Sequence, residues 1–206
     1  MVAVTPLPDG RRRLIDISFA EALEDDAETG GQRSDELVEA ATYWRRAGDH
    51  DRARRALLAA VDADDGTGFF DAKAAYAAYL MLRGLRESAD ELFARLLQSR
   101  STREQTYLSA ACAYARDGRP RVALRWANVG LQRLVPEGFP RDFAGGDPGY
   151  ELLRFRRSLR QRLGEPADAL DEVFDQALHR GRELSERIRT LRRQAGAPAA
   201  DTTDTA

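Results

Sequence analysis

The sequence predicts an all-α protein, an α-solenoid of helix hairpins that ends in a long C-terminal capping helix. Three observations favour this fold. A glycine–alanine pattern recurs at a nearly constant interval, apolar residues around it follow the helical period, and glycine and proline gather in a few segments between the periodic stretches. The 206 residues are enough for one domain or for a short solenoid with tails.

Residues 1–33 precede the repeated pattern and are rich in proline, glycine and acidic residues. We expect them to form a flexible N-terminal arm, with one short helix around residues 18–26. Three arginines before Leu14 resemble the start of a signal peptide, but Asp16 interrupts the apolar stretch that would have to insert. Together with the single cysteine, Cys112, this favours a cytoplasmic location.

The repeated pattern is a glycine followed five residues later by an alanine. It occurs three times, at Gly48 and Ala53, Gly84 and Ala89, and Gly118 and Ala123. The glycines are 36 and 34 residues apart, and a bulky residue stands four places before each of them: Trp44, Leu80 and Tyr114. We expect each glycine to end the first helix of a hairpin, where a left-handed residue is needed. We expect each alanine to lie where the two helices touch.

On these residues, the stretch 34–137 resembles three tetratricopeptide repeats (TPRs), a family with a period of about 34 residues. The resemblance implies stacked helix hairpins in which the first helix of each pair lines a concave groove that holds a peptide. Some members of the family grip a terminal carboxylate with Lys and Asn. Other residue types hold those sites here, among them Val38, Thr42 and Gln105, so that mode of binding is not expected.

The chain beyond the third repeat divides into a loop, a helix pair and a tail. Residues 138–148 are a Pro/Gly-rich loop in which Phe139 and Phe143 either anchor the loop to the solenoid or cover the groove as a lid. Residues 149–194 are predicted to form a divergent helix pair that caps the array. Residues 195–206 are expected to be a disordered tail.

The second helix of this cap, expected over residues 168–194, carries apolar or small residues at alternating intervals of four and three. They are Leu170, Phe174, Ala177, Gly181, Leu184, Ile188 and Leu191. This heptad spacing is typical of a seam between helices. It favours a capping helix that lies along the last repeat. The alternative is the seam of a homo-oligomer, against which a glycine at a seam position counts.

Five arginines gather on the first helix of the cap, expected over residues 150–163. They are Arg154, Arg156, Arg157, Arg160 and Arg162. They can pair with the acidic residues that follow in the sequence, bind an acidic protein, or contact nucleic acid. The formal net charge of -2 and the lack of interleaved aromatic residues count against nucleic acid.

No pattern in the sequence predicts catalysis, and we expect a protein that is not an enzyme. The only histidines, His50 and His179, are far apart, and Cys112 has no histidine near it in the sequence. This inventory cannot close a structural zinc site, and the sequence has no phosphate-binding or nucleophile motif. We therefore expect no metal and no cofactor.

The concave groove is the candidate binding site. Helical spacing from the repeated residues predicts a lining of Val38, Thr42, Arg45, Arg46, Ala78, Met81, Leu82, Leu108, Cys112 and Arg116. We expect Met81, Leu82 and Leu108 to form an apolar floor separate from the core, with arginines at the rim. This surface suits a peptide or an amphipathic helix of another protein. The chain's own N-terminal arm or C-terminal helix is the alternative occupant, and no membrane partner is expected.

Overall fold

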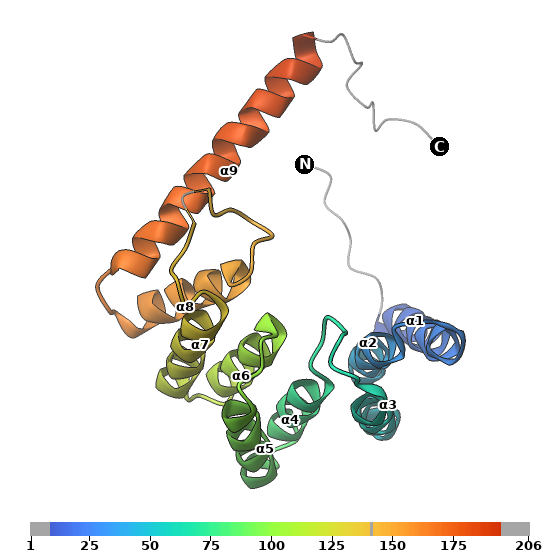
Figure 1. Cartoon of the computed structure of the whole chain (residues 1–206). Coiled ribbons are helices and arrows are strands. Elements are labelled where there is room, and N and C mark those ends of the chain that lie inside the picture. Colours follow the sequence, from blue (N-terminus) through green and yellow to red (C-terminus); the bar gives the residue numbers. More distant parts are fainter. Residues whose placement is uncertain (1–8, 141, 195–206) are drawn as a thin grey trace.

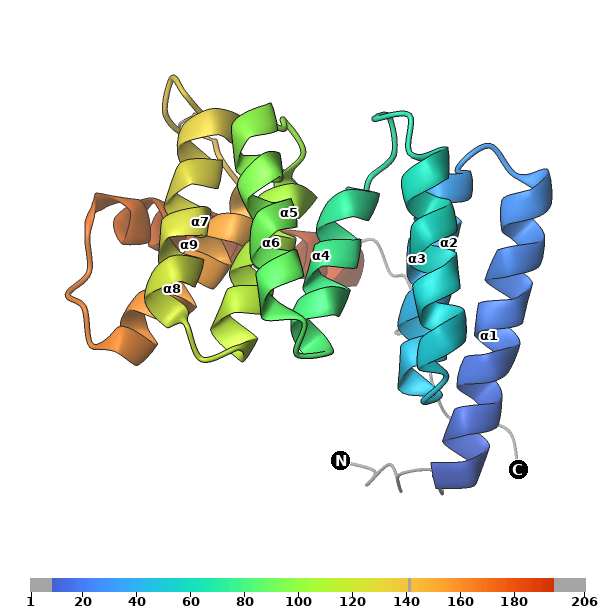
Figure 2. The same cartoon turned by 90° about the horizontal axis from the view of Figure 1, so that it is seen from below.

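A computed structural model describes residues 9–140 and 142–194, and every regular element within them is a helix (Figure 1). The all-α prediction is therefore confirmed. The helices are α1 (Asp9–Thr29), α2 (Arg33–Arg46), α3 (His50–Ala63), α4 (Ala72–Leu82), α5 (Arg86–Ser99), α6 (Glu104–Arg116), α7 (Pro120–Leu134), α8 (Tyr150–Leu163) and α9 (Ala169–Gln194). Seen from below, α1 to α7 run side by side with roughly parallel axes (Figure 2).

Tight turns join α2 to α3, α4 to α5 and α6 to α7, and the predicted glycines stand in them. Gly48, Gly84 and Gly118 have φ values of 83°, 78° and 78°, in the left-handed region where a side chain is strained. The residue after each glycine donates its backbone N–H to the bulky residue five places earlier. The bond from Asp49 to the Trp44 carbonyl, for example, is 2.9 Å long. This is the Schellman pattern of a helix end, and it explains why the glycine and the bulky residue keep a fixed spacing.

The alanines of the pattern lie at the contacts between helices. Ala53, Ala89 and Ala123 each have 0% of their surface exposed, as the sequence predicts. Ala89 belongs to a buried cluster that also holds Phe93, whose ring stacks edge-on against Trp126 at 5.7 Å. Trp126 thus supplies bulk in the third hairpin at a place where the periodic position itself holds only Ala127.

Enlarging one of these alanines should loosen the array. We expect Ala89→Leu to lower the free energy of unfolding by about 1–3 kcal/mol, because a well-packed contact has no room for three more carbons. Ala94→Leu is the matched control, since Ala94 lies on the exposed side of the same helix. Urea unfolding measures both. Equal midpoints for the two variants would show that Ala89 is not at a close helix contact.

The N-terminal segment differs from the expectation of a flexible arm. Asp9–Thr29 forms a 21-residue helix that packs along α2. Ala20 and Ala27 are buried in this contact, and the Asp16 carboxylate, 4% exposed, pairs with Arg46 at 2.9 Å. Ile17 and Leu23 also pack against this cluster but are only partly buried, and charged residues interrupt the apolar pattern of the segment in the sequence. Residues 1–8 and the expected tail, 195–206, lie outside the described residues.

The loop after α7 is anchored to the helices that follow it. Phe143 is 1% exposed, and its ring lies 4.5 Å from that of Phe139 and 5.9 Å from that of Tyr150 on α8. Arg180 of α9 donates a hydrogen bond of 2.8 Å to the Phe143 carbonyl. Both phenylalanines therefore serve as anchors between the loop and the α8–α9 pair. Their packing does not support the alternative of a lid on the groove.

Candidate functional site

A groove of about 410 Å³ lies between α2, α4 and α6. These helices follow one another along the same side of the array in Figure 1, and α4 packs against both of its neighbours. Seven of the predicted residues line the groove: Val38, Thr42, Arg45, Ala78, Met81, Leu82 and Arg116. Periodicity places them together because residues three and four apart share one face of a helix.

Three predicted residues are not part of this lining. Arg46 turns toward α1, where it pairs with Asp16 and lies over the ring of Tyr43 at 5.2 Å. Leu108 and Cys112 are half-buried residues of α6, and Leu108 packs against the core. The prediction of Arg46 as a rim residue was wrong, because the sequence analysis did not predict that α1 would pack beside α2 and bind Arg46 through Asp16.

The floor of the groove is continuous with the core, in contrast to the expectation. Met81 is 4% exposed and Val38 is 6% exposed, so both are core residues that show only an edge to the groove. The guanidinium of Arg119 lies 3.0 Å from the Met81 sulfur on the inner side. Leu82, at 52% exposed, is the large apolar side chain of the lining that a partner can reach. A charge at position 81 would therefore test folding rather than binding.

The charge of the groove is positive. Arg45 and Arg116 line it, and neither forms an ion pair with any residue in the described parts of the chain. Burial lowers the pKa of Arg45 below its usual value, and repulsion from Arg116 and Arg46 lowers it further. Asp117 is the only acidic residue of the lining, and Arg86 and Arg119 already hold it, each at 2.7 Å. An acidic group entering the groove would relieve this repulsion.

The lining also includes residues that the sequence did not predict. Phe70 precedes α4, and Tyr79 points its hydroxyl at the His50 carbonyl, 2.8 Å away. Gly84 and Asp117 come from the hairpin turns. The prediction followed only the faces of the first helices, whereas the groove continues over the turns at their ends. The turn glycines mark the hairpin turns in the sequence, so they could have been used to predict that Gly84 and Asp117 line the groove.

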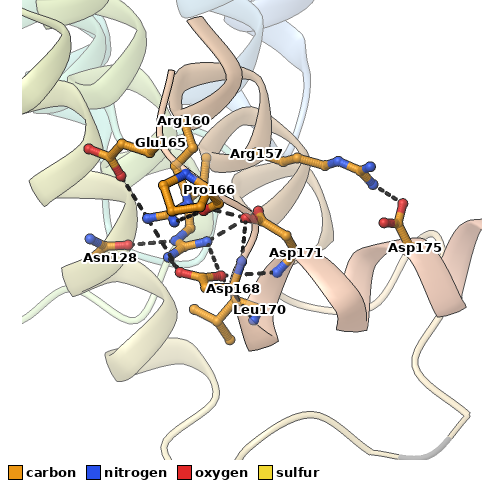
Figure 3. A network of polar contacts seen from close by, with 10 residues as sticks. Asn128, Arg157, Arg160, Glu165, Pro166, Asp168, Leu170, Asp171 and Asp175 are labelled. Atoms are coloured by element: carbon orange, nitrogen blue, oxygen red, sulfur yellow. Dashed lines mark hydrogen bonds and ion pairs between the residues drawn. The ribbon is translucent and has the colours of Figure 1, made fainter. Parts of the chain in front are cut away.

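Four of the five arginines of α8 pair within the chain, and Figure 3 shows the contacts of Arg157 and Arg160. Arg156 is 5% exposed and donates to Asn128 of α7 at 2.7 Å and to Asp168 at 3.0 Å. Its hydrogen bonds lower the pKa of Asp168 to about 2. Arg160 pairs with Glu165 at 2.7 Å and with Asp171 at 3.1 Å.

Two further arginines of α8 have acidic partners. Arg157 pairs with Asp175 of α9, and Arg154 donates to Glu151 on its own helix at 2.8 Å. Arg162 alone of the five has no ion pair among the described residues. Pairing within the chain is thus the arrangement that the structure favours for this basic helix, and little of its charge is left for a phosphate backbone.

We next consider metal ligands, the cysteine thiol and membrane-spanning helices among the described residues. Within 9–140 and 142–194, no three side chains of His, Cys, Asp or Glu are grouped so that they could hold a metal ion. Burial raises the pKa of the Cys112 thiol, which favours the unreactive protonated form. Nor is any helix of these ranges both long and apolar enough to cross a bilayer.

Searches against protein-family models, curated proteins and solved structures found no match to this chain. The class that the described residues define is an all-helical protein with hairpins whose two helices are joined by glycine turns. Its distinguishing surface is a positively charged groove between the first helices of three successive hairpins.

Proposed function

We propose that the protein is a non-catalytic cytoplasmic adaptor of the TPR type, which binds a peptide or an amphipathic helix of another protein in the groove between α2, α4 and α6. The repeat pattern supports the family, because three glycine–alanine units recur 36 and 34 residues apart, near the TPR period. The packing of α4 against both α2 and α6 is compatible with stacked hairpins.

The observation that carries the proposal is the composition of the groove. Small and apolar side chains line its centre, Leu82 offers an accessible apolar contact, and Arg45 and Arg116 have no acidic partner in the described chain. Apolar anchors supply most of the affinity of such contacts, while complementary charge sets orientation and association rate. The partner that fits best has apolar residues followed by acidic ones.

The alternative functions have less support. A nucleic-acid contact through 150–163 would have to break the ion pairs that hold Arg156, Arg157 and Arg160. A homo-oligomer through 168–194 would lack half of its seam, since Phe174 and Ala177 are already buried within the chain. Occupation of the groove by the N-terminal segment is also less favoured, because α1 packs along α2.

The test uses the full chain as bait to isolate a binding protein, followed by titration of that protein with variants. We expect Leu82→Asp to weaken binding by about thirtyfold or more, because the apolar side chain that the partner would cover in the complex becomes charged. Arg116→Glu should weaken it by about tenfold. Both residues are exposed, so the helical circular dichroism should not change.

The matched controls are Val122→Asp and Arg121→Glu, which make the same changes of charge at exposed positions of α7 outside the groove. They should bind as tightly as the unaltered chain. If the α7 variants lost binding and the groove variants kept it, the proposed site would be wrong.

A further inference from the structure

The distal half of α9 has no partner among the described residues. Its proximal half is packed, with Phe174 at 5% and Ala177 at 2% exposed. Beyond Arg180 every described residue is exposed, and Figure 1 shows this end of the helix reaching away from the other helices. Of the residues that the structure describes, those that line the hollow along this half all belong to α9.

Three aliphatic side chains form a stripe on this exposed half. Leu184, Ile188 and Leu191 are 59%, 42% and 62% exposed. They stand at positions i, i+4 and i+7, so they lie on one face of the helix. This is the spacing with which an amphipathic helix inserts its anchors into an apolar groove.

Positive charge surrounds the stripe. Between residues 182 and 194 there are five arginines and two glutamates, and none of these arginines forms an ion pair with a described residue. By helical spacing, Arg187 and Arg192 flank the stripe on its two sides, whereas Arg182 and Arg189 lie toward the opposite face. Glu183 and Glu186 share the hollow that Leu184 and Leu191 line, but by helical spacing both lie farther around the helix from the stripe than Arg187. The edges of the stripe therefore favour an acidic surface.

We propose that the distal half of α9 is a docking helix that inserts Leu184, Ile188 and Leu191 into an apolar groove with an acidic rim on another protein. Basic flanks on both sides of the anchors complement such a rim, and the projection of the helix keeps all of its sides clear of the other described helices. This surface is separate from the groove of α2, α4 and α6.

A second copy of the chain fits this surface poorly. In a parallel or an antiparallel pair of these helices, the residues that flank one stripe meet those that flank the other. Here that would place arginine beside arginine, which is unfavourable. The free stripe also spans little more than one heptad, whereas a sustained coiled coil extends over about 3–4 heptads.

A membrane or nucleic acid also fits poorly. Helices that lie in a membrane surface carry Trp, Phe or Leu on the apolar face, and membrane binding strengthens with the apolar area that is buried; this stripe offers only three aliphatic side chains. Phosphate contacts would use the arginines but leave three exposed aliphatic side chains without a role. A protein groove uses both features.

Calcium-loaded calmodulin is a suitable probe, because it presents an apolar groove, and chelation of calcium closes that groove. Binding to the full chain is measured by isothermal titration with calcium and then with chelator. We expect a one-to-one complex with calcium and none with chelator. Leu184→Gln combined with Ile188→Gln should weaken the complex by about thirtyfold or more.

The arginines allow a comparison of two double variants that have the same net charge as each other. Arg187→Gln with Arg192→Gln should weaken binding by about tenfold, whereas Arg182→Gln with Arg189→Gln should change it by less than about twofold. Equal losses for the two pairs, or no complex in calcium, would overturn the proposal. Light scattering that shows a dimer of the unaltered chain, dissociated by the Leu184 and Ile188 changes, would assign the stripe to a second copy instead.

Discussion

Replacing Arg156 with methionine should lower the free energy of unfolding by about 3–5 kcal/mol, the usual cost of removing one partner from a buried charge network. The guanidinium is 5% exposed and contacts α7 through Asn128 and the start of α9 through Asp168 and Asp171. Asp171 is itself 6% exposed and, once Arg156 is gone, keeps Arg160 as its only cationic partner, together with a hydrogen bond from the Asp168 backbone N–H, among the described residues. Methionine fills much of the space, so the loss reports on the charge rather than on a cavity.

Urea unfolding measures this effect, and Arg154→Met is the matched control. Arg154 stands two residues earlier on α8, is 64% exposed and pairs only with Glu151. Such a surface pair contributes about 0–1 kcal/mol. If the two variants had the same stability, the Arg156 network would not be what joins α8 to α9.

The same network predicts a dependence on acid. Hydrogen bonds from Arg156, with smaller contributions from the Asp171 backbone N–H and the charge of Arg160, lower the pKa of Asp168 from its usual 3.8 to about 2 in the folded chain. Because the folded pKa is depressed, this carboxylate stabilises the fold fully above pH 3.8, and its contribution is lost as the pH falls toward 2. Stability measured across this range should fall less steeply in Arg156→Met than in the unaltered chain. Parallel curves would contradict the assignment.

Replacing Gly130 with leucine should destabilise the chain by at least about 3 kcal/mol, at the upper end of the range for overpacking. A Cβ atom at position 130 would lie 2.6 Å from Cβ of Tyr107 on α6 and 2.5 Å from a methyl group of Leu152 on α8. The Tyr107 atom is next to the backbone and cannot move away cheaply. Gly130 is therefore where α7 approaches both of its neighbours.

Gly181→Leu provides the control for this change. Gly181 lies within α9, and a Cβ atom there would meet nothing within 4 Å. Leucine is a better helix former than glycine by close to 1 kcal/mol, so this variant should be neutral or slightly more stable. Thermal unfolding measures both variants. If both substitutions lowered the melting temperature, or both raised it, the close approach at Gly130 would be contradicted.

The parts of the fold that could be predicted are those encoded by nearby residues. Gly48, Gly84 and Gly118 mark helix ends because a left-handed turn and its hydrogen bond involve only a few consecutive positions. Helix α1 could not be predicted in this way. Its buried apolar residues are alanines, with Ile17 and Leu23 only partly buried beside them, and its ion pairs join Asp16 to Arg46 and Glu21 to Arg52, which are distant in the sequence.

In the groove, too, features encoded by nearby residues could be predicted, whereas features that depend on distant contacts could not. Thr42, Ala78 and Leu82 follow from helical period alone, and the structure places them in the lining. Met81 is buried in the core cluster and contacts Arg119 of the next hairpin, and no local pattern indicates these contacts. The pairing of the α8 arginines was one of three open alternatives, since it depends on how α9 folds back over α8.

The central claim is that a polypeptide binds between α2, α4 and α6, and site-specific photo-cross-linking tests it most directly. A photoreactive amino acid is placed at Leu82 in the groove or, as a control, at Val122 on α7, both of which are exposed. The chain is then irradiated together with the protein that it captures. The proposal predicts a cross-linked product from position 82 and none from position 122. A product from position 122 alone would contradict it.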